Sequence, residues 1–174
     1  SEKVLPRIWE RYRASEIHAD LRRDFANFVV KTDDRESPFK WRKVGSEPKD
    51  GWPLVVAMHG GGGTTKLIND SQWEGMFSDY YKDHPEMGGY IYCALRAPND
   101  EWNGFYDDAI CPLFERLIAE FAVSLPMNLN RVSITGASHG GYGAFVIGPK
   151  IPYRFAAVNA SASAPTPGET AGEN

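Results

Sequence analysis

The chain has 174 residues, of which 42% are hydrophobic and 24% are charged, a balance typical of a soluble globular protein. This length allows one domain with a real core and leaves no room for a second. A formal net charge of −4 argues against nucleic acid or an anionic membrane as the main partner.

No stretch predicts a membrane span, and residues 1–20 are too charged for a signal peptide. The compartment stays open, since a secreted or periplasmic protein whose signal was removed before Ser1 also fits. The two cysteines, Cys93 and Cys111, are expected to be free thiols.

The N-terminal part is expected to be helical and then extended. Residues 4–30 place apolar side chains three or four apart, which predicts an amphipathic helix packed on the body. Residues 31–38 are a polar break, and residues 39–44 alternate like an antiparallel strand with one solvated face.

Strands and helices alternate through the rest of the chain. This order predicts an α/β fold with a mostly parallel sheet and helices on both faces. In such sheets the active groups collect at the carboxyl ends of the strands. Asp107 or Asp108 is the expected N-cap of a helix over residues 109–124. The predicted elements are strands at 53–58, 90–95, 132–135 and 155–160, and helices at 70–83, 109–124 and 142–147.

Residues 136–140 read Gly-Ala-Ser-His-Gly between a β-branched strand and a helix. The pattern G-x-S-x-G in this context is the nucleophile elbow, a sharp turn that lifts a serine hydroxyl above the sheet. The residues two before and two after the serine must lack a Cβ so that strand and helix can close around it. Ser138 is therefore the candidate nucleophile. A glycine-rich turn with an idle serine is the alternative, because glycine and serine are common.

A second motif, one histidine and four glycines at residues 59–63, follows the strand 53–58. Acyl transfer by a serine needs N–H donors for the oxyanion. Gly61 or Gly62 can turn an N–H into the pocket, and the backbone N–H of His139 would be the other donor. Neither a phosphate-binding P-loop nor a dinucleotide fingerprint fits this glycine cluster. A merely flexible loop remains the alternative.

Three runs carry a resemblance to a known family: PLVVAMHGGGGTT (53–65), RVSITGASHGGYGA (131–144) and FAAVNASAS (155–163). Together they resemble the α/β-hydrolase superfamily, and within it carbohydrate-esterase and polyhydroxyalkanoate-depolymerase-like serine esterases. The resemblance implies a hydrolase that cleaves small-molecule or sugar-linked carboxylic esters through an acyl-serine intermediate. It also implies Ser138 as nucleophile, with the glycine loop and the His139 N–H as oxyanion hole.

The chain departs from this pattern in its acid and base. In these enzymes an acid and then a histidine follow the serine, yet no histidine follows Ser138, and the acids after it are Glu169 and Glu173. We therefore expect the N-terminal portion of a hydrolase whose acid and histidine lie on a separate C-terminal fragment of the same precursor. Cleavage would fall in the loop-like residues 165–174. The alternatives are a non-catalytic binding or scaffolding domain and a serine peptidase of the same fold.

Three domain segments are expected: a helical extension at 1–38, the hydrolase core at 39–163 and an exposed tail at 164–174. No cofactor is expected, and the histidines lack the spacing of a metal site. His59 is expected to brace the glycine loop. Three aromatic residues after a strand could line a substrate pocket or pack in the core, with both roles open: Trp102, Phe105 and Tyr106. Residues 99–103 could bind a sugar or solvate a loop.

Overall fold

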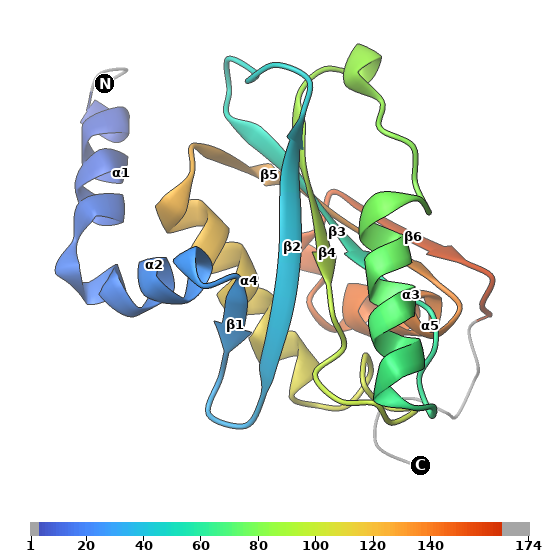
Figure 1. Ribbon diagram of the computed structural model, residues 1–174. Helices are drawn as coiled ribbons and strands as arrows, with labels where there is room; N and C mark the ends of the chain where they lie inside the picture. The colour runs from blue at the N-terminus through green and yellow to red at the C-terminus, as the bar shows by residue number, and fades with distance from the viewer. Residues whose placement is uncertain (1–3, 165–174) are drawn as a thin grey trace.

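The computed structural model describes residues 4–164, which form one six-stranded sheet with helices on both faces (Figure 1). The α/β fold predicted from the sequence is confirmed. The strands, in the order β1-β2-β4-β3-β5-β6 across the sheet, are β1 (Val29–Lys31), β2 (Glu36–Val44), β3 (Trp52–Met58), β4 (Tyr90–Leu95), β5 (Met127–Ala137) and β6 (Ala157–Ser161). The helices are α1 (Val4–Ala14), α2 (Ala19–Ala26), α3 (Lys66–Ser78), α4 (Ile110–Ser124) and α5 (His139–Lys150), with short 3-10 helices at Glu16–His18, Pro85–Met87 and Pro152–Arg154.

The four strands β4, β3, β5 and β6 run parallel, while β1 and β2 pair antiparallel at one edge. Parallel neighbours need a crossover between them, and α3, α4 and α5 supply the three crossovers. Met58 at the end of β3 pairs with Gly136 near the end of β5. The glycine loop and the serine turn therefore leave the sheet side by side.

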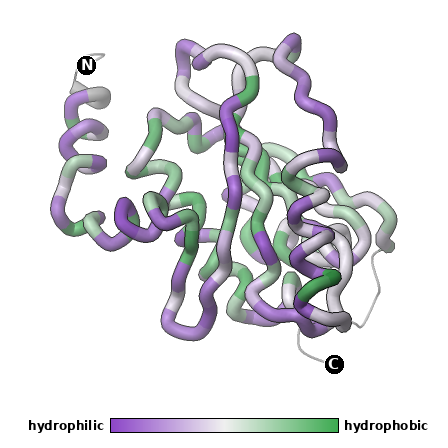
Figure 2. Tube along the Cα trace, viewed as in Figure 1, coloured by the Kyte–Doolittle hydropathy of each residue, from purple (hydrophilic) through white to green (hydrophobic). Residues whose placement is uncertain are grey.

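Alternate residues of β4 enter two separate cores. Ile91, Cys93 and Leu95 join the large cluster beneath α4 and α5, whereas Tyr92 and Ala94 join a smaller one beneath α3. Strands buried on both faces are continuously apolar in sequence, which made β3 and β4 predictable. Figure 2 shows the contrast between these hydrophobic central strands and the hydrophilic hairpin that joins β1 to β2.

The N-terminal segment differs from the prediction of one long helix. Residues 4–30 form α1, a 3-10 turn and α2, and then enter β1. Ser15 is extended at the break, with φ −64° and ψ 140°. The Arg22 guanidinium donates to the carbonyl oxygens of Arg13 and Ser15, so it satisfies groups that the interrupted helix leaves open. The expected boundary at residue 38 falls inside β2.

Helix α3 begins at Lys66, four residues before the predicted start, and ends at Ser78. The Thr65 hydroxyl caps it by accepting from the Ile68 N–H at 3.4 Å. Leu67 and Ile68 are 80% and 48% exposed, so the apolar stripe used for the prediction did not mark the first turn. Likewise α5 begins earlier than predicted, at His139.

The predicted helix 109–124 matches α4 to within one residue, but Ala109 is its N-cap. Asp107 acts from two residues upstream, because its Oδ1 accepts from the Ala109 N–H at 2.9 Å. Its other oxygen, Oδ2, pairs with Arg35 at 2.8 Å. Strand β6 is shifted by one or two residues from the predicted 155–160. Apart from Ala164, the expected tail 164–174 lies outside the described residues.

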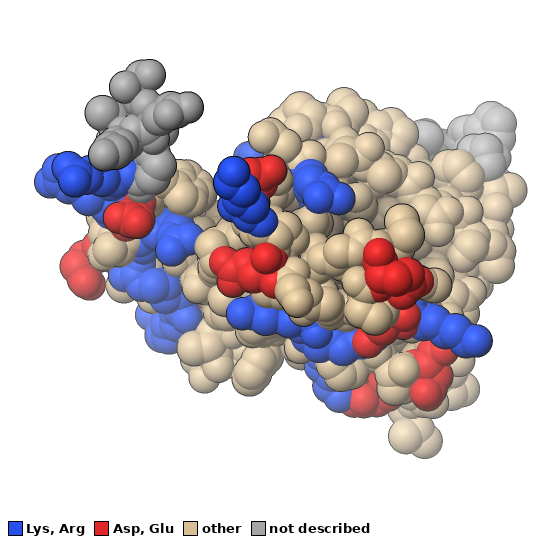
Figure 3. Space-filling model, turned by 90° about the horizontal axis from the view of Figure 1, so that it is seen from above, with Lys and Arg blue, Asp and Glu red and all other residues tan. Residues whose placement is uncertain are grey.

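Charged side chains of both signs are interspersed on the face that Figure 3 shows. Many of them pair, as Arg42 does with Asp83 at 2.6 Å. None of the helices in residues 4–164 combines the length and hydrophobicity needed to cross a membrane. Cys93 is buried and Cys111 half-buried, and both are free thiols, as predicted.

Candidate active site

Ser138 occupies the tight turn between β5 and α5. Its backbone has φ 53° and ψ −117°, a region that residues with a side chain rarely adopt. The Ser138 N–H donates to the Ser161 carbonyl at 2.9 Å, and the Ser138 carbonyl accepts from the Tyr142 N–H at 3.0 Å. The residue itself is exposed. Strained backbone of this kind persists only where its surroundings hold it, and it concentrates at functional sites.

The glycines two before and two after Ser138 are required by close packing. A Cβ on Gly136 would lie 2.0 Å from the Gly140 carbonyl oxygen, and a Cβ on Gly140 would lie 2.2 Å from the Met58 carbonyl oxygen. Both distances are far below van der Waals contact. The prediction that these two positions must lack a side chain is confirmed.

The glycine loop passes directly over this turn. Gly61, Gly62 and Gly63 have φ of 102°, 78° and 57°, values that glycine adopts without steric cost. A Cβ on Gly62 would lie 2.6 Å from the His139 ring, and a Cβ on Gly60 would lie 3.6 Å from the Ser138 Cβ. The structure thus brings the predicted loop and serine turn together.

The amide groups of the loop differ in what they bind. The Gly62 N–H donates to Asn69 Oδ1 at 2.8 Å. The Gly61 N–H has no hydrogen-bond partner among residues 4–164. His139 is the first residue of α5, and N–H groups of a first helical turn have no partner within the helix. The Gly140 N–H donates to the His59 carbonyl at 2.9 Å. Of the two predicted loop donors, Gly61 is the one left open.

His59 is fully buried and bonded through both ring nitrogens. Its Nε2 accepts from the Ala97 N–H at 3.0 Å, which places the proton on Nδ1, 2.5 Å from the Gly60 carbonyl oxygen. Burial lowers the pKa of His59 to about 4. The side chain therefore stays neutral and links the glycine loop to the end of β4, the bracing role predicted for it.

The His139 ring is buried beneath the glycine loop. Its Nε2 lies 2.8 Å from the Trp102 carbonyl oxygen and must donate to it, while Nδ1 has no partner among the described residues. The ring packs on those of Phe105 and Trp102, with centroids 5.0 and 5.5 Å away. Burial lowers the pKa of His139 to about 4. The side chain supports the loop, and only the backbone N–H can face Ser138.

The three aromatic candidates for a pocket wall lie at different depths. Trp102 is 41% exposed, and its Cβ lies 3.7 Å from the point that a Cβ on Gly63 would occupy. Tyr106 is nearly buried, and Phe105 is completely buried in the core. Phe105 therefore packs beneath the site instead of lining it. Of the three, Trp102 offers a surface beside the glycine loop.

A polar network that the sequence did not reveal supports the loop from below. Asn69 is 1% exposed, and its Nδ2 donates to Asp100 Oδ1 at 3.0 Å. The buried Arg96 pairs with Asp100 and with Asp70, and it donates to the Asn99 carbonyl at 3.0 Å. Asp100 thus has a structural partner, in contrast to the sugar-binding or solvating role considered from sequence. Nothing in the spacing of these residues marks them, because they come together only when β3 and β4 pair.

The histidines of residues 4–164 have other contacts than the Ser138 hydroxyl. No hydrogen bond joins the Ser138 hydroxyl to a histidine there. His84 is exposed and pairs with Glu86 at 2.7 Å, and His18 packs on the Tyr12 ring with centroids 4.3 Å apart. The same residues contain no cluster of three histidine, cysteine or acidic side chains that could hold a metal ion.

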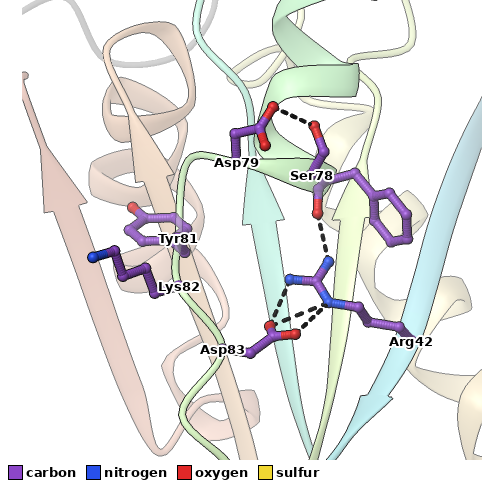
Figure 4. Close-up of a pocket in the computed structure, with 7 residues that line it drawn as sticks. Arg42, Ser78, Asp79, Tyr81, Lys82 and Asp83 are labelled. Atoms are coloured by element: carbon purple, nitrogen blue, oxygen red, sulfur yellow. Dashed lines mark hydrogen bonds and ion pairs between the residues drawn. The ribbon is translucent and has the colours of Figure 1, made fainter.

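Several hollows border helix α3. One of about 250 Å³ borders Gly60 and is lined by Gln72, Gly75 and Tyr80 among others. Gln72 Oε1 lies 3.1 Å, and the Ser138 Cβ 3.6 Å, from the point that a Cβ on Gly60 would occupy. Another hollow, of about 440 Å³, shares no lining residue with the serine turn. Its Arg42 is paired with Asp83, as Figure 4 shows.

Comparison with known proteins finds no matching family model and no similar curated sequence. Solved structures match in shape. A thermostable esterase superposes with a TM-score of 0.55 at 23% identity, covering 75% of this chain and 38% of its own. The enterobactin esterase FES from Shigella flexneri, solved with 2,3-di-hydroxy-N-benzoyl-serine, superposes with a TM-score of 0.56 at 14% identity, covering 82% and 38%. The chain thus spans about 38% of the length of these two esterases. The similarity establishes a fold of the α/β-hydrolase type.

Proposed function

We propose that this chain belongs to a carboxylic ester hydrolase that acts through an acyl-serine intermediate on Ser138. One observation carries the proposal: an exposed serine is held at positive φ between β5 and α5, beside a glycine loop in which the Gly61 N–H has no hydrogen-bond partner among residues 4–164. This is the arrangement expected of a nucleophile elbow.

The proposed oxyanion hole consists of the His139 and Gly61 N–H groups. Gly62 is assigned a structural role, since its N–H is bonded to Asn69. The amino end of α5 adds a favourable dipole for developing negative charge. Loss of one oxyanion donor typically lowers kcat by about 10²- to 10³-fold.

The chemistry assigned to Ser138 has two halves. Its Oγ attacks the ester carbonyl carbon as a base takes the hydroxyl proton, and the negative oxygen of the tetrahedral intermediate lies against the two N–H groups. Collapse breaks the bond to the alcohol, which leaves with the proton. Water then attacks the acyl-serine by the same route and frees the acid.

We assign the base and its acidic partner to a separate C-terminal fragment of the same precursor, with residues 39–163 as the N-terminal part of the hydrolase core. Two observations support this assignment. None of the described histidines reaches Ser138, and β6 pairs only with β5 among the described strands, leaving Val158 45% exposed. A further parallel strand paired with the outer edge of β6 would lie close to Ser161, whose carbonyl accepts from the Ser138 N–H.

Trp102 is the proposed contact for the substrate, which suits an aromatic or sugar-linked ester. The exposed ring lies next to the glycine loop, and aromatic faces pack on planar acyl groups. A Trp102→Ala variant is expected to raise KM for an aromatic ester and to change that for an acetyl ester little.

The proposal is tested on the intact gene product with paired ester and amide substrates of one acyl group. We expect ester hydrolysis that Ser138→Ala abolishes, and a second polypeptide that copurifies with this one. Cleavage of the amide in addition to the ester would favour the serine peptidase. A single species of 19.4 kDa that cleaves neither substrate would favour the binding domain.

A further inference from the structure

We infer that Asn69 is a positioning residue that fixes the glycine loop so that Gly61, and not Gly62, presents its amide to the oxyanion. The catalytic consequence rests on the function proposed above. The structural part, that Asn69 fastens the Gly62 amide, stands on the geometry alone.

The contact between Asn69 and the loop is close and buried. Asn69 lies in the first turn of α3 and is 1% exposed, and its Oδ1 accepts from the Gly62 N–H at 2.8 Å. A Cβ on Gly61 would lie 2.4 Å from the same Oδ1. The amide oxygen therefore fills the inside of the bend that Gly61 and Gly62 make.

The loop needs such a fastener because of its own composition. Gly61, Gly62 and Gly63 are free to rotate, since glycine populates positive and negative φ about equally. The backbone torsions of Gly61 set the direction of its N–H relative to the peptide group that carries the Gly62 N–H, so rotation about them would misdirect the Gly61 N–H. A hydrogen bond from a rigid helix removes that freedom before a substrate arrives.

The orientation of the Asn69 amide is set by charge. Its Nδ2 donates to Asp100 Oδ1 at 3.0 Å. If the amide were flipped, its oxygen would face the Asp100 carboxylate and its NH₂ would face the Gly62 N–H, so both contacts would be repulsive. Asp100 is in turn held by the buried Arg96. The order Arg96, Asp100, Asn69, Gly62 is a chain of donors and acceptors that permits one arrangement.

The structural part is tested by amide hydrogen exchange in the intact protein labelled with ¹⁵N-glycine. We expect the Gly62 amide to be protected and the Gly61 amide to exchange much faster. Asn69→Ala should reduce the protection of Gly62 at least tenfold, whereas Asn130→Ala, a matched change at an exposed residue of β5, should leave it unchanged. Equal exchange of Gly61 and Gly62 in the wild type would overturn the inference, whatever the activity.

The catalytic part is tested by steady-state kinetics of the same variants. The Gly61 N–H is proposed to stabilise the oxyanion of the transition state and not the bound ester. Its misplacement in Asn69→Ala should therefore lower kcat by roughly 10- to 100-fold and change KM less than threefold. Loss of Gly62 protection with an unchanged kcat would overturn the positioning role. A wild type that hydrolyses no ester would instead defeat the proposed function, and the exchange result would still decide the structural part.

Asn69→Asp separates positioning from folding. The variant keeps an acceptor for Gly62, but its carboxylate would face Asp100, which pairs with Arg96, as Asp70 also does. Protonation restores a donor toward Asp100, so both the Gly62 protection and the ratio of variant to wild-type kcat should rise as the pH falls. A ratio that is independent of pH would contradict the proposed donor chain.

Discussion

Two regions of this molecule each contain a buried ionisable side chain. In one region the side chain is paired with opposite charges, and in the other it accepts no hydrogen bond. Below the glycine loop, Arg96 has partners in Asp70, Asp100 and the Ala97 carbonyl. Between α2 and α4, Glu120 is fully buried, and neither of its carboxylate oxygens accepts a hydrogen bond from residues 4–164. Its nearest cation is Arg116, whose Nε lies 3.6 Å from Oε1.

The pKa values follow this difference. Burial raises the pKa of Asp100, but hydrogen bonds from Arg96 and Asn69 outweigh it and lower the pKa overall. For Glu120, burial dominates and raises the pKa to about 8, since Arg116 is directed to Asp20 and Asp24. Glu120 is fully buried and accepts no hydrogen bond, whereas Asp100 is about one-third exposed and hydrogen-bonded, so burial and pairing together separate the two pKa values. Charge pairing supports the candidate site, whereas the contact between α2 and α4 contains a neutral acid.

The largest effect is expected where the backbone of the site is most tightly packed. Gly140→Ala would place a Cβ 2.2 Å from the Met58 carbonyl oxygen, and the backbone of β3 cannot yield as a flexible side chain can. We expect a loss of about 3 kcal/mol or more in the free energy of unfolding. Urea denaturation measures it, and a loss below about 1 kcal/mol would show that this region is not rigid.

Arg96→Met tests the charge pairing below the loop. The variant keeps most of the side-chain volume but removes every donor to Asp70 and Asp100. Because these aspartates are each about one-third exposed, solvent screens part of the loss, and we expect about 2–3 kcal/mol of destabilisation. The rate of ester hydrolysis should fall as well, since Arg96 no longer holds the Asp100 carboxylate that orients the Asn69 amide. If the free energy of unfolding and the rate of ester hydrolysis were both unchanged, the charge pairs of Arg96 would not stabilise this region, and the contrast between the two regions would be wrong.

Glu120→Gln tests the neutral acid between α2 and α4. The pKa of Glu120 in the folded protein, about 8, lies above the ordinary 4.5. Its contribution to stability is therefore complete below pH 4.5 and is lost as the pH rises toward 8. Relative to wild type, the variant should become more stable by roughly 4 kcal/mol between pH 5 and pH 9, because each unit of pKa difference corresponds to about 1.4 kcal/mol. A constant difference across that range would mean that Glu120 is already ionised at pH 5.

The smallest effect is expected at Gly75, a glycine of α3 that no neighbour crowds. A Cβ there would meet no atom within 4 Å. Gly75→Ala should therefore stabilise the protein by about 0.5–1 kcal/mol through the better helix propensity of alanine. It is the matched control for Gly140→Ala. If both substitutions destabilised equally, crowding at residue 140 would not be the cause.

Sequence patterns predicted the parts of the fold that depend on local chemistry. β3 and β4 are continuous apolar runs, and Gly136 and Gly140 mark a close approach that only glycine permits. The break at Ser15 was missed, because Arg22 stabilises it from across the turn.

The candidate site also contains residues that the sequence predicted and contacts that it did not. Ser138 and the glycine loop could be predicted, but the fastening of Gly62 by Asn69 could not, since that contact depends on how α3 leaves the loop. The burial of Phe105 also escaped prediction, because an aromatic residue after a strand suits a pocket and a core equally.

The most direct test of the central claim is covalent labelling of the intact protein with a fluorophosphonate, followed by peptide mapping. If Ser138 is an activated nucleophile, the reagent should modify that residue alone, and Ser138→Ala should carry no label. An unlabelled Ser138 under conditions that label a known serine hydrolase completely would contradict the account.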